Sequence, residues 1–172
     1  GALVPLLSVF EILYVLVSAR FTLRFVEGER ECSCRFLPPE SDVTGLVPKE
    51  LFFTKGVGKH REKLPSFELA LRSAGIAACN LVRVSSICPP GCRILSRSGG
   101  VRKLKPGQVT FVVMSEAATR EAHRLIAASI GVARPRDKKL FGYLSEHHSF
   151  GENEETAGDY AEEYVIKTLG EF

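Results

Sequence analysis

Residues 80–91 constrain the fold of this 172-residue chain more than any other stretch. Their first part is rich in leucine and valine, which favour extended backbone and predict a strand. The strand runs into two adjacent serines, Ser85 and Ser86, and residues 89–91 then read Pro-Pro-Gly. Proline has no N–H for a sheet ladder and glycine accepts tight turns, so the strand must stop there. The serine pair is therefore predicted to lie at a strand end, where the chain turns sharply.

A serine at such a corner can cut its own chain. Its hydroxyl can attack the carbonyl carbon of the preceding peptide bond when the turn holds the two groups together. The resulting ester can eliminate to leave a dehydroalanine, which hydrolyses to a pyruvoyl group. Ser85 and Ser86 suit this chemistry, although serine pairs are common and a plain turn is the simpler interpretation of the pair alone.

Composition indicates an ordinary globular protein. The chain is long enough for one domain with a core, and 45% hydrophobic and 25% charged residues are typical values. The formal net charge of +3 is too small to indicate binding to nucleic acid or to an anionic membrane. We therefore predict one domain whose core has neither nucleic acid nor membrane as a partner.

The cysteine pattern does not predict a metal site. The five cysteines are Cys32, Cys34, Cys79, Cys88 and Cys92, and no pair has CxxC spacing. Cys88 and Cys92 could supply two ligands, but no second pair of Cys or His completes a zinc site. We expect buried or idle thiols in a reducing, cytoplasmic compartment, and no bound metal.

Residues 1–46 differ from the rest of the chain. Residues 2–17 are mostly apolar, but Glu11 interrupts them, and a membrane-spanning helix needs about 20 apolar residues. No basic residue precedes this run, as a signal peptide would require, and residues 38–42 read as a linker. We predict that residues 1–46 lie outside the folded domain, as a disordered extension or as upstream sequence read from an incorrect start. A membrane anchor is the alternative.

Residues 47–172 carry the regular patterns of a folded domain. Strands are predicted at 50–54, 80–86, 108–114, 125–135 and 140–145, and helices at 67–74 and 154–169. Tight turns are predicted at Gly56 and Gly58 and at 98–100, and a connection at 115–124. Ser66 is the expected N-cap of the first helix, and Gly75 its C′ residue. These elements predict an α+β fold, a layered α/β/β/α sandwich of mainly antiparallel sheets with covering helices.

The segment 125–135 has a strict period of two. Its larger residues alternate with small ones, and the small set is Ala127, Ser129, Gly131 and Ala133. This period predicts a strand with one bulky face and one face of small residues. The small face should let another sheet or a ligand approach closely.

Three stretches of the chain resemble the pyruvoyl-dependent arginine decarboxylase family. They are residues 67–76 (FELALRSAGI), 80–90 (NLVRVSSICPP) and 141–146 (FGYLSE), and the resemblance spans roughly residues 47–170. It implies that the chain cuts itself between Ser85 and Ser86. The products would be a β chain of residues 47–85 and an α chain of residues 86–172.

The resemblance also implies an activity, a carboxy-lyase reaction that converts L-arginine to agmatine and CO2 in polyamine biosynthesis or acid tolerance. Ser86 would become the pyruvoyl group, a covalent cofactor that forms an imine with the substrate amine. Glu146 matches the family's proton donor, a role that needs a raised pKa near neutral pH. Asn80 matches the asparagine that supports self-cleavage and the active site. Glu68 falls where the family can carry an aspartate facing the substrate guanidinium, and it is one methylene longer.

Geometry suggests that this site forms between subunits. Asn80 and Ser86 would face the same side of a straight strand, but six residues separate them by roughly 20 Å. They would not meet within one chain. This agrees with the homotrimer of cleaved αβ protomers that the resemblance implies.

Two other functions fit the sequence less well. A non-catalytic paralogue that assembles with or regulates an active decarboxylase would share the fold without being cut. The joint presence of Asn80, Ser85, Ser86 and Glu146 disfavours it. A basic module for nucleic acid fits poorly with a net charge of +3.

Overall fold

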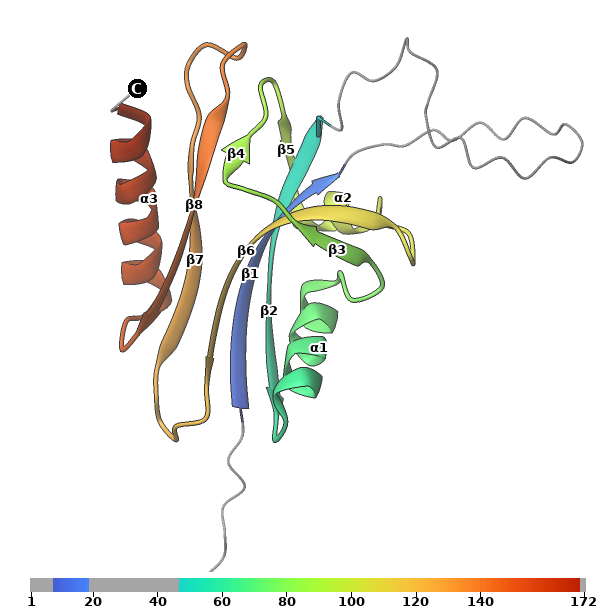
Figure 1. Ribbon diagram of the computed structural model, residues 1–172, viewed down its shortest axis with the longest axis vertical. Helices are drawn as coiled ribbons and strands as arrows, with labels where there is room; N and C mark the ends of the chain where they lie inside the picture. Colours follow the sequence, from blue (N-terminus) through green and yellow to red (C-terminus); the bar gives the residue numbers. More distant parts are fainter. Residues whose placement is uncertain (1–7, 19–46, 171–172) are drawn as a thin grey trace, which may run out of the picture.

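The computed structural model describes residues 8–18 and 47–170 (Figure 1). Eight strands and three helices are found in these residues. The strands are β1 (Ser8–Ser18), β2 (Glu50–His60), β3 (Asn80–Arg83), β4 (Ile87–Cys88), β5 (Arg93–Leu95), β6 (Val109–Thr119), β7 (Ile126–Ala133) and β8 (Gly142–Phe150). The helices are α1 (Lys63–Ala74), α2 (Arg97–Val101) and α3 (Glu154–Gly170). The predicted α+β class is confirmed.

The strands form two sheets. The five-stranded sheet has the order β3-β6-β1-β2-β5, and the three-stranded sheet has the order β4-β8-β7. Most neighbours are antiparallel, as predicted, while β3 with β6 and β2 with β5 are parallel. Helix α1 packs against β2 and β1, and α3 packs against β7 and β8 (Figure 1).

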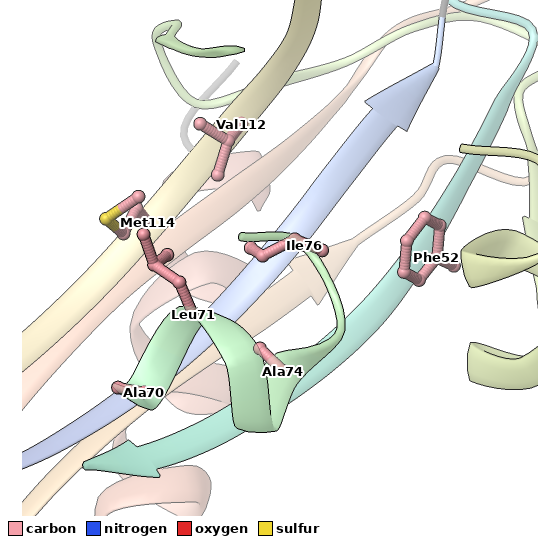
Figure 2. Packing of buried hydrophobic residues seen from close by; sticks show 7 residues of the cluster. All are labelled: Phe52, Ala70, Leu71, Ala74, Ile76, Val112 and Met114. Atoms are coloured by element: carbon pink, nitrogen blue, oxygen red, sulfur yellow. The ribbon is translucent and has the colours of Figure 1, made fainter. Parts of the chain in front are cut away.

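Two apolar clusters hold these parts together. The first lies between α1 and the five-stranded sheet (Figure 2) and consists of Phe52, Ala70, Leu71, Ala74, Ile76, Val112 and Met114. The second joins the two sheets and consists of Leu51, Cys88, Cys92, Val113 and Leu144. Successive strand residues face opposite sides, so Leu51 and Phe52 serve different clusters. The five-stranded sheet is therefore packed on both faces.

Strand β1 is the middle strand of the larger sheet. Residues Val9 to Val17 are paired antiparallel with β2 on one side and with β6 on the other. The expectation that all of residues 1–46 lie outside the folded domain thus differs from the structure for these eleven residues. A strand inside a packed sheet can be an uninterrupted apolar run, so its composition resembles that of an anchor. The expected linker at 38–42 lies outside the described residues.

The two glycines of β2 make room for α1. The tight turn predicted at Gly56 and Gly58 is wrong, because both glycines lie inside the strand. A Cβ atom on Gly58 would collide with the carbonyl oxygen of Ser66, and one on Gly56 with that of Ala70. The sequence pattern was therefore that of a close helix–strand contact rather than of a turn.

The first helix begins earlier than predicted. It starts at Lys63 with Glu62 in the N-cap position, so the prediction for Ser66 is wrong. The Ser66 hydroxyl instead donates a 2.8 Å hydrogen bond to the Gly58 carbonyl. The end was predicted correctly, because Gly75 adopts the left-handed conformation with φ 82°.

Two further boundaries differ from the predictions. Strand β6 continues to Thr119, through part of the predicted connection at 115–124. Residues 98–100, predicted as a turn, lie in the short helix α2. Its N-cap is Ser96, whose hydroxyl accepts a hydrogen bond from the Gly99 N–H.

The small face of β7 is confirmed, and α3 covers it. The Ser129 hydroxyl donates a 2.6 Å hydrogen bond to the Ala157 carbonyl of the helix. A Cβ atom on Gly131 would collide with the carbonyl of Ala161. The close partner is therefore a helix rather than the sheet or ligand that was expected.

Gly131→Ala is expected to destabilise the protein by about 1–3 kcal/mol, because α3 must move away from β7 to accept the methyl group. The measurement is the midpoint of thermal unfolding at one protein concentration. Gly158→Ala on α3 is the matched control, since a Cβ atom there meets nothing within 4 Å. Alanine is also the better helix former, so the midpoint of this control should not fall. Equal midpoints for Gly131→Ala and the parent protein would contradict the close packing.

Candidate active site

The serine pair lies where the chain crosses from one sheet to the other. Strand β3 is an edge of the five-stranded sheet, and β4 is an edge of the three-stranded sheet. Val84, Ser85 and Ser86 form the link between them (Figure 1). The strand predicted at 80–86 is shorter in the structure, because β3 ends at Arg83 and the serines belong to a link that spans two separate ladders.

Three backbone hydrogen bonds fix this link. The Val84 N–H donates to the Val112 carbonyl of β6 at 3.0 Å, and the Leu144 N–H of β8 donates to the Ser86 carbonyl at 2.8 Å. Between these anchors, the Ile87 N–H donates to the Ser85 carbonyl at 2.9 Å. This last bond closes a three-residue turn centred on Ser86, an inverse γ-turn since φ of Ser86 is not positive.

The sequence could not reveal these three donors. Each is a main-chain N–H, and every residue except proline carries one. The side chain of Ile87, for example, is 44% exposed and has no chemistry of its own. The signal lies in the pairing of strands, which only the structure provides.

The predicted turn after the serines is present. The Cys92 N–H donates to the Pro89 carbonyl at 3.2 Å, and Gly91 has φ 64°. Cys88 and Cys92 are buried on either side of this turn, and both thiols are free. Burial raises the pKa of the Cys92 thiol to about 11, so it is protonated at neutral pH. Cys32 and Cys34 lie outside the described residues.

Glu146 lies on the strand that holds Ser86. Strand β4 pairs Ile87 with Tyr143 of β8, and the next contact in that direction is the Leu144–Ser86 hydrogen bond. Glu146 is two residues beyond Leu144 and therefore on the same face of β8. Its side chain is exposed in the single protomer. Ser86 is thus bonded to the strand that carries Glu146, two residues before that side chain.

Asn80 and Glu68 are engaged elsewhere. Asn80 begins β3, at the end away from the serines, and its Nδ2 donates a 2.7 Å hydrogen bond to the Gly107 carbonyl. Glu68 lies on α1 and pairs with Arg72, whose Nε is 2.8 Å from its Oε1. Within residues 8–18 and 47–170, no hydrogen bond or ion pair joins either side chain to Ser85, Ser86 or Glu146.

The adjacent histidines face opposite sides of β8, as expected for a strand. His147 faces α3, where its Nε2 lies 3.3 Å from Oε2 of Glu152 and its ring centroid lies 4.4 Å from that of Tyr160. His148 is exposed. Among the described residues, no three His, Cys, Asp or Glu side chains are placed to hold a metal ion.

A shallow cavity of about 230 Å³ adjoins the turn that follows the serines. Cys88, Pro89 and Gly91 line one side, and basic residues of the loop between β7 and β8 line the other. Neither serine of the link lines it, nor does Glu146. The serine link therefore lies outside this cavity, with Ser85 exposed and Ser86 half-buried in the single protomer.

None of the helices in the described parts of the chain is long and apolar enough to cross a membrane.

Comparison with known proteins identifies the family. A family model described as pyruvoyl-dependent arginine decarboxylase matches residues 50–171. A protein of Chloroherpeton thalassium named "Probable pyruvoyl-dependent arginine decarboxylase" is 61% identical over 124 residues, which are 72% of this chain and 68% of the relative. Pyruvoyl-dependent arginine decarboxylases of Methanocella arvoryzae and Methanococcoides burtonii are 61% and 57% identical over 126 and 124 residues, with 73% and 72% of this chain and 76% and 69% of the relatives covered. The chain belongs to the pyruvoyl-dependent arginine decarboxylase family.

Proposed function

We propose that this protein is a self-processing arginine decarboxylase that releases CO2 from L-arginine and leaves agmatine. The observation that carries the proposal is the Ser85–Ser86 peptide, which is held in a tight turn between two sheets of a chain from this family. The nucleophile and the attacked carbonyl belong to the link, and the backbone donor, Ile87, is the residue that follows it.

Self-cleavage begins at the Ser86 hydroxyl. Its oxygen bonds to the Ser85 carbonyl carbon, the C–N bond breaks, and the Ser86 nitrogen takes the hydroxyl proton. A base then removes the Ser86 Cα proton, and the new ester leaves as the Ser85 carboxylate. The remaining dehydroalanine tautomerises, adds one water and releases one ammonia, which yields the pyruvoyl group at residue 86. Neither oxidant nor reductant is needed.

The fold allows the two fragments to stay together after the cut. The fragment ending at Ser85 holds β1, β2, α1 and β3, and the fragment starting at residue 86 holds β4 through α3. Strand β3 pairs with β6 and β2 pairs with β5 across the two fragments. Cleavage therefore removes one peptide bond while these ladders remain.

The structure suits a pyruvoyl group at residue 86. Cleavage does not touch the Ser86 carbonyl, so its hydrogen bond from the Leu144 N–H can persist in the processed chain. The pyruvoyl ketone would condense with the substrate amine and accept the electron pair as CO2 leaves. The bond from Leu144 would orient that group relative to β8, which also carries Glu146.

Glu146 is the proposed acid that returns a proton to the former Cα of the substrate. A carboxylic acid can do this near neutral pH only if its surroundings disfavour the charged form. Because Glu146 is exposed in one protomer, we propose that a neighbouring subunit covers it. The site would then lie between subunits of a homotrimer, with Asn80 and Glu68 supplied by the neighbour.

Exposed apolar side chains near the serines support such an interface. Val82 and Val84 before the serines and Ile87 after them are between 38% and 44% exposed. Clustered apolar side chains on a surface are typical of sites that another protein covers. These residues surround the link, so an assembled subunit would exclude water from the reaction.

Glu68 has the chemistry to hold a guanidinium group. Its carboxylate already pairs with the guanidinium of Arg72 on the next turn of α1. An exposed pair of this kind contributes only about 0.3–0.5 kcal/mol, so a substrate guanidinium could displace it. We propose this role for Glu68 in the assembled protein.

The proposal also includes the layer arrangement of the protomer, its two chains after the cut and its cellular compartment. We propose that α1, the five-stranded sheet, the three-stranded sheet and α3 form a layered α/β/β/α sandwich in each protomer. We propose that the cut leaves the residues up to Ser85, which include β1 and β2, as the β chain and residues 86–172 as the α chain, in a reducing, cytoplasmic compartment. In support of the compartment, the thiols of Cys79, Cys88 and Cys92 are free.

Carboxyl-labelled L-arginine provides the test. We expect labelled CO2 and an equal amount of agmatine, with both lost after the enzyme is treated with borohydride, which reduces the ketone. Agmatine is identified by mass spectrometry, and D-arginine serves as the matched control substrate. A cut protein that releases no CO2 would contradict the arginine assignment. An uncut and inactive protein would favour the non-catalytic alternative.

A further inference from the structure

We propose that the backbone N–H of Ile87 stabilises the oxyanion that forms on the Ser85 carbonyl during self-cleavage. This inference rests on the proposed function, since it concerns the first step of the same reaction. It assigns a catalytic role to a main-chain group whose side chain has none.

The geometry of the turn supports this role. The Ile87 nitrogen lies 2.9 Å from the Ser85 carbonyl oxygen before any reaction has occurred. Donors that act in oxyanion stabilisation lie about 2.7–3.1 Å from the oxygen that becomes charged. When the Ser86 hydroxyl oxygen bonds to the Ser85 carbonyl carbon, the π electron pair moves onto this oxygen. The donor is therefore in place where the charge develops.

The two sheets hold the turn in this conformation. The Val84 N–H is bound to β6 on one side, and the Ser86 carbonyl is bound to β8 on the other. Both ends of the link are thus fixed to packed ladders, and the turn between them cannot easily open. A donor fixed in advance needs little reorganisation when the charge appears, which is what makes such groups effective.

The side chain of Asn80 does not occupy this position in the protomer. Its Nδ2 is bound to the Gly107 carbonyl, at the end of β3 away from the serines. The Ile87 N–H, at the first residue of β4, follows the attacked Ser85–Ser86 bond directly in the same chain. Self-cleavage that depends on it is expected to be first order and independent of protein concentration.

The test replaces single backbone N–H groups by oxygen in the full chain. Cell-free synthesis with the α-hydroxy acid analogue of isoleucine at position 87 removes the donor and keeps the side chain. We expect cleavage between residues 85 and 86 to slow by about 10²–10³-fold, the usual effect of losing one oxyanion donor. The ester also makes the Ser86 Cα proton more acidic, so slower cleavage cannot come from the elimination step.

The α-hydroxy analogue of leucine at position 144 is the matched control. It removes an equally short bond at the same turn, but to the Ser86 carbonyl, which is not attacked. We expect formation of the ester intermediate, trapped with hydroxylamine, to slow by less than about tenfold there, because the Ser86 carbonyl takes up charge only in the later elimination. Mass spectrometry separates the native cut from hydrolysis of the introduced ester, because the two fragments differ by residue 86.

Side-chain variants keep the proposal testable if an ester variant fails to fold. Ile87→Val and Ile87→Ala retain the N–H, and both should cut within a few-fold of the parent rate. Loss of cleavage in folded Ile87→Ala would overturn the proposal, as would equal rates for the position 87 ester and the parent. A parent chain that is not cut would contradict the proposed function itself. A parent chain that is cut as fast as its position 87 ester would contradict only the role of the Ile87 N–H.

Discussion

Ser86→Ala is expected to remain a single, uncut chain. The methyl group cannot attack the Ser85 carbonyl, so neither ester nor pyruvoyl group can form. No arginine decarboxylation should be detectable, because the electron sink is missing. The link is anchored by backbone bonds that alanine retains, so the variant should fold like the precursor. A denaturing gel, with an activity assay beside it, makes the measurement.

Ser85→Ala is the matched control for this prediction. Ser85 contributes only its carbonyl group to the reaction, and alanine has the same carbonyl. This variant should therefore still be cut and should gain activity. Cleavage of Ser86→Ala together with failure of Ser85→Ala would reverse the assignment of the nucleophile.

Glu146→Gln is expected to cut itself normally and then turn over poorly. The amide keeps the size and position of the side chain but cannot donate a carboxylic proton to the substrate carbon. A positioned acid contributes typically 10²–10⁴-fold, so we expect kcat to fall by about that factor. The extent of cleavage and kcat for L-arginine are measured on the same preparation.

Glu155→Gln provides the control for Glu146→Gln. Glu155 is an exposed carboxylate on α3, remote in sequence from the serine link. This variant should match the parent in both cleavage and turnover. An unchanged kcat in fully cut Glu146→Gln would remove Glu146 from the mechanism, whereas a failure to cut would place it in self-processing instead.

Local sequence patterns were sufficient for much of the fold. The strict alternation of residues 125–135 identified β7 and its small face, and the Pro-Pro-Gly turn identified the end of the serine segment. Both patterns depend only on side-chain alternation and on the backbone limits of proline and glycine. They hold whatever surrounds them in the fold.

Other features depend on neighbours that the sequence does not name. Gly56 and Gly58 resemble a turn until α1 is seen against them, and the apolar run of β1 resembles an anchor until β2 and β6 flank it. In both cases the structure of the segment depends on the elements that pack or pair with it. A single sequence does not state which strands pair.

The site likewise contains residues that the sequence predicts and residues that it does not. Ser85, Ser86 and Glu146 could be predicted because their side chains carry the chemistry and the family pattern. The backbone donors of Ile87 and Leu144 could not, because a main-chain N–H has no residue type. Contacts of Glu68 and Asn80 with the serines are absent from the described protomer, and their proposed roles depend on a neighbouring subunit.

The intact mass of the purified protein under denaturing conditions tests the central claim most directly. The account predicts two fragments divided between residues 85 and 86. The carboxyl-terminal fragment should be lighter by one ammonia than a chain that begins with serine, and borohydride should add two hydrogens to it. A single chain of unchanged mass, inert to borohydride, would contradict the account.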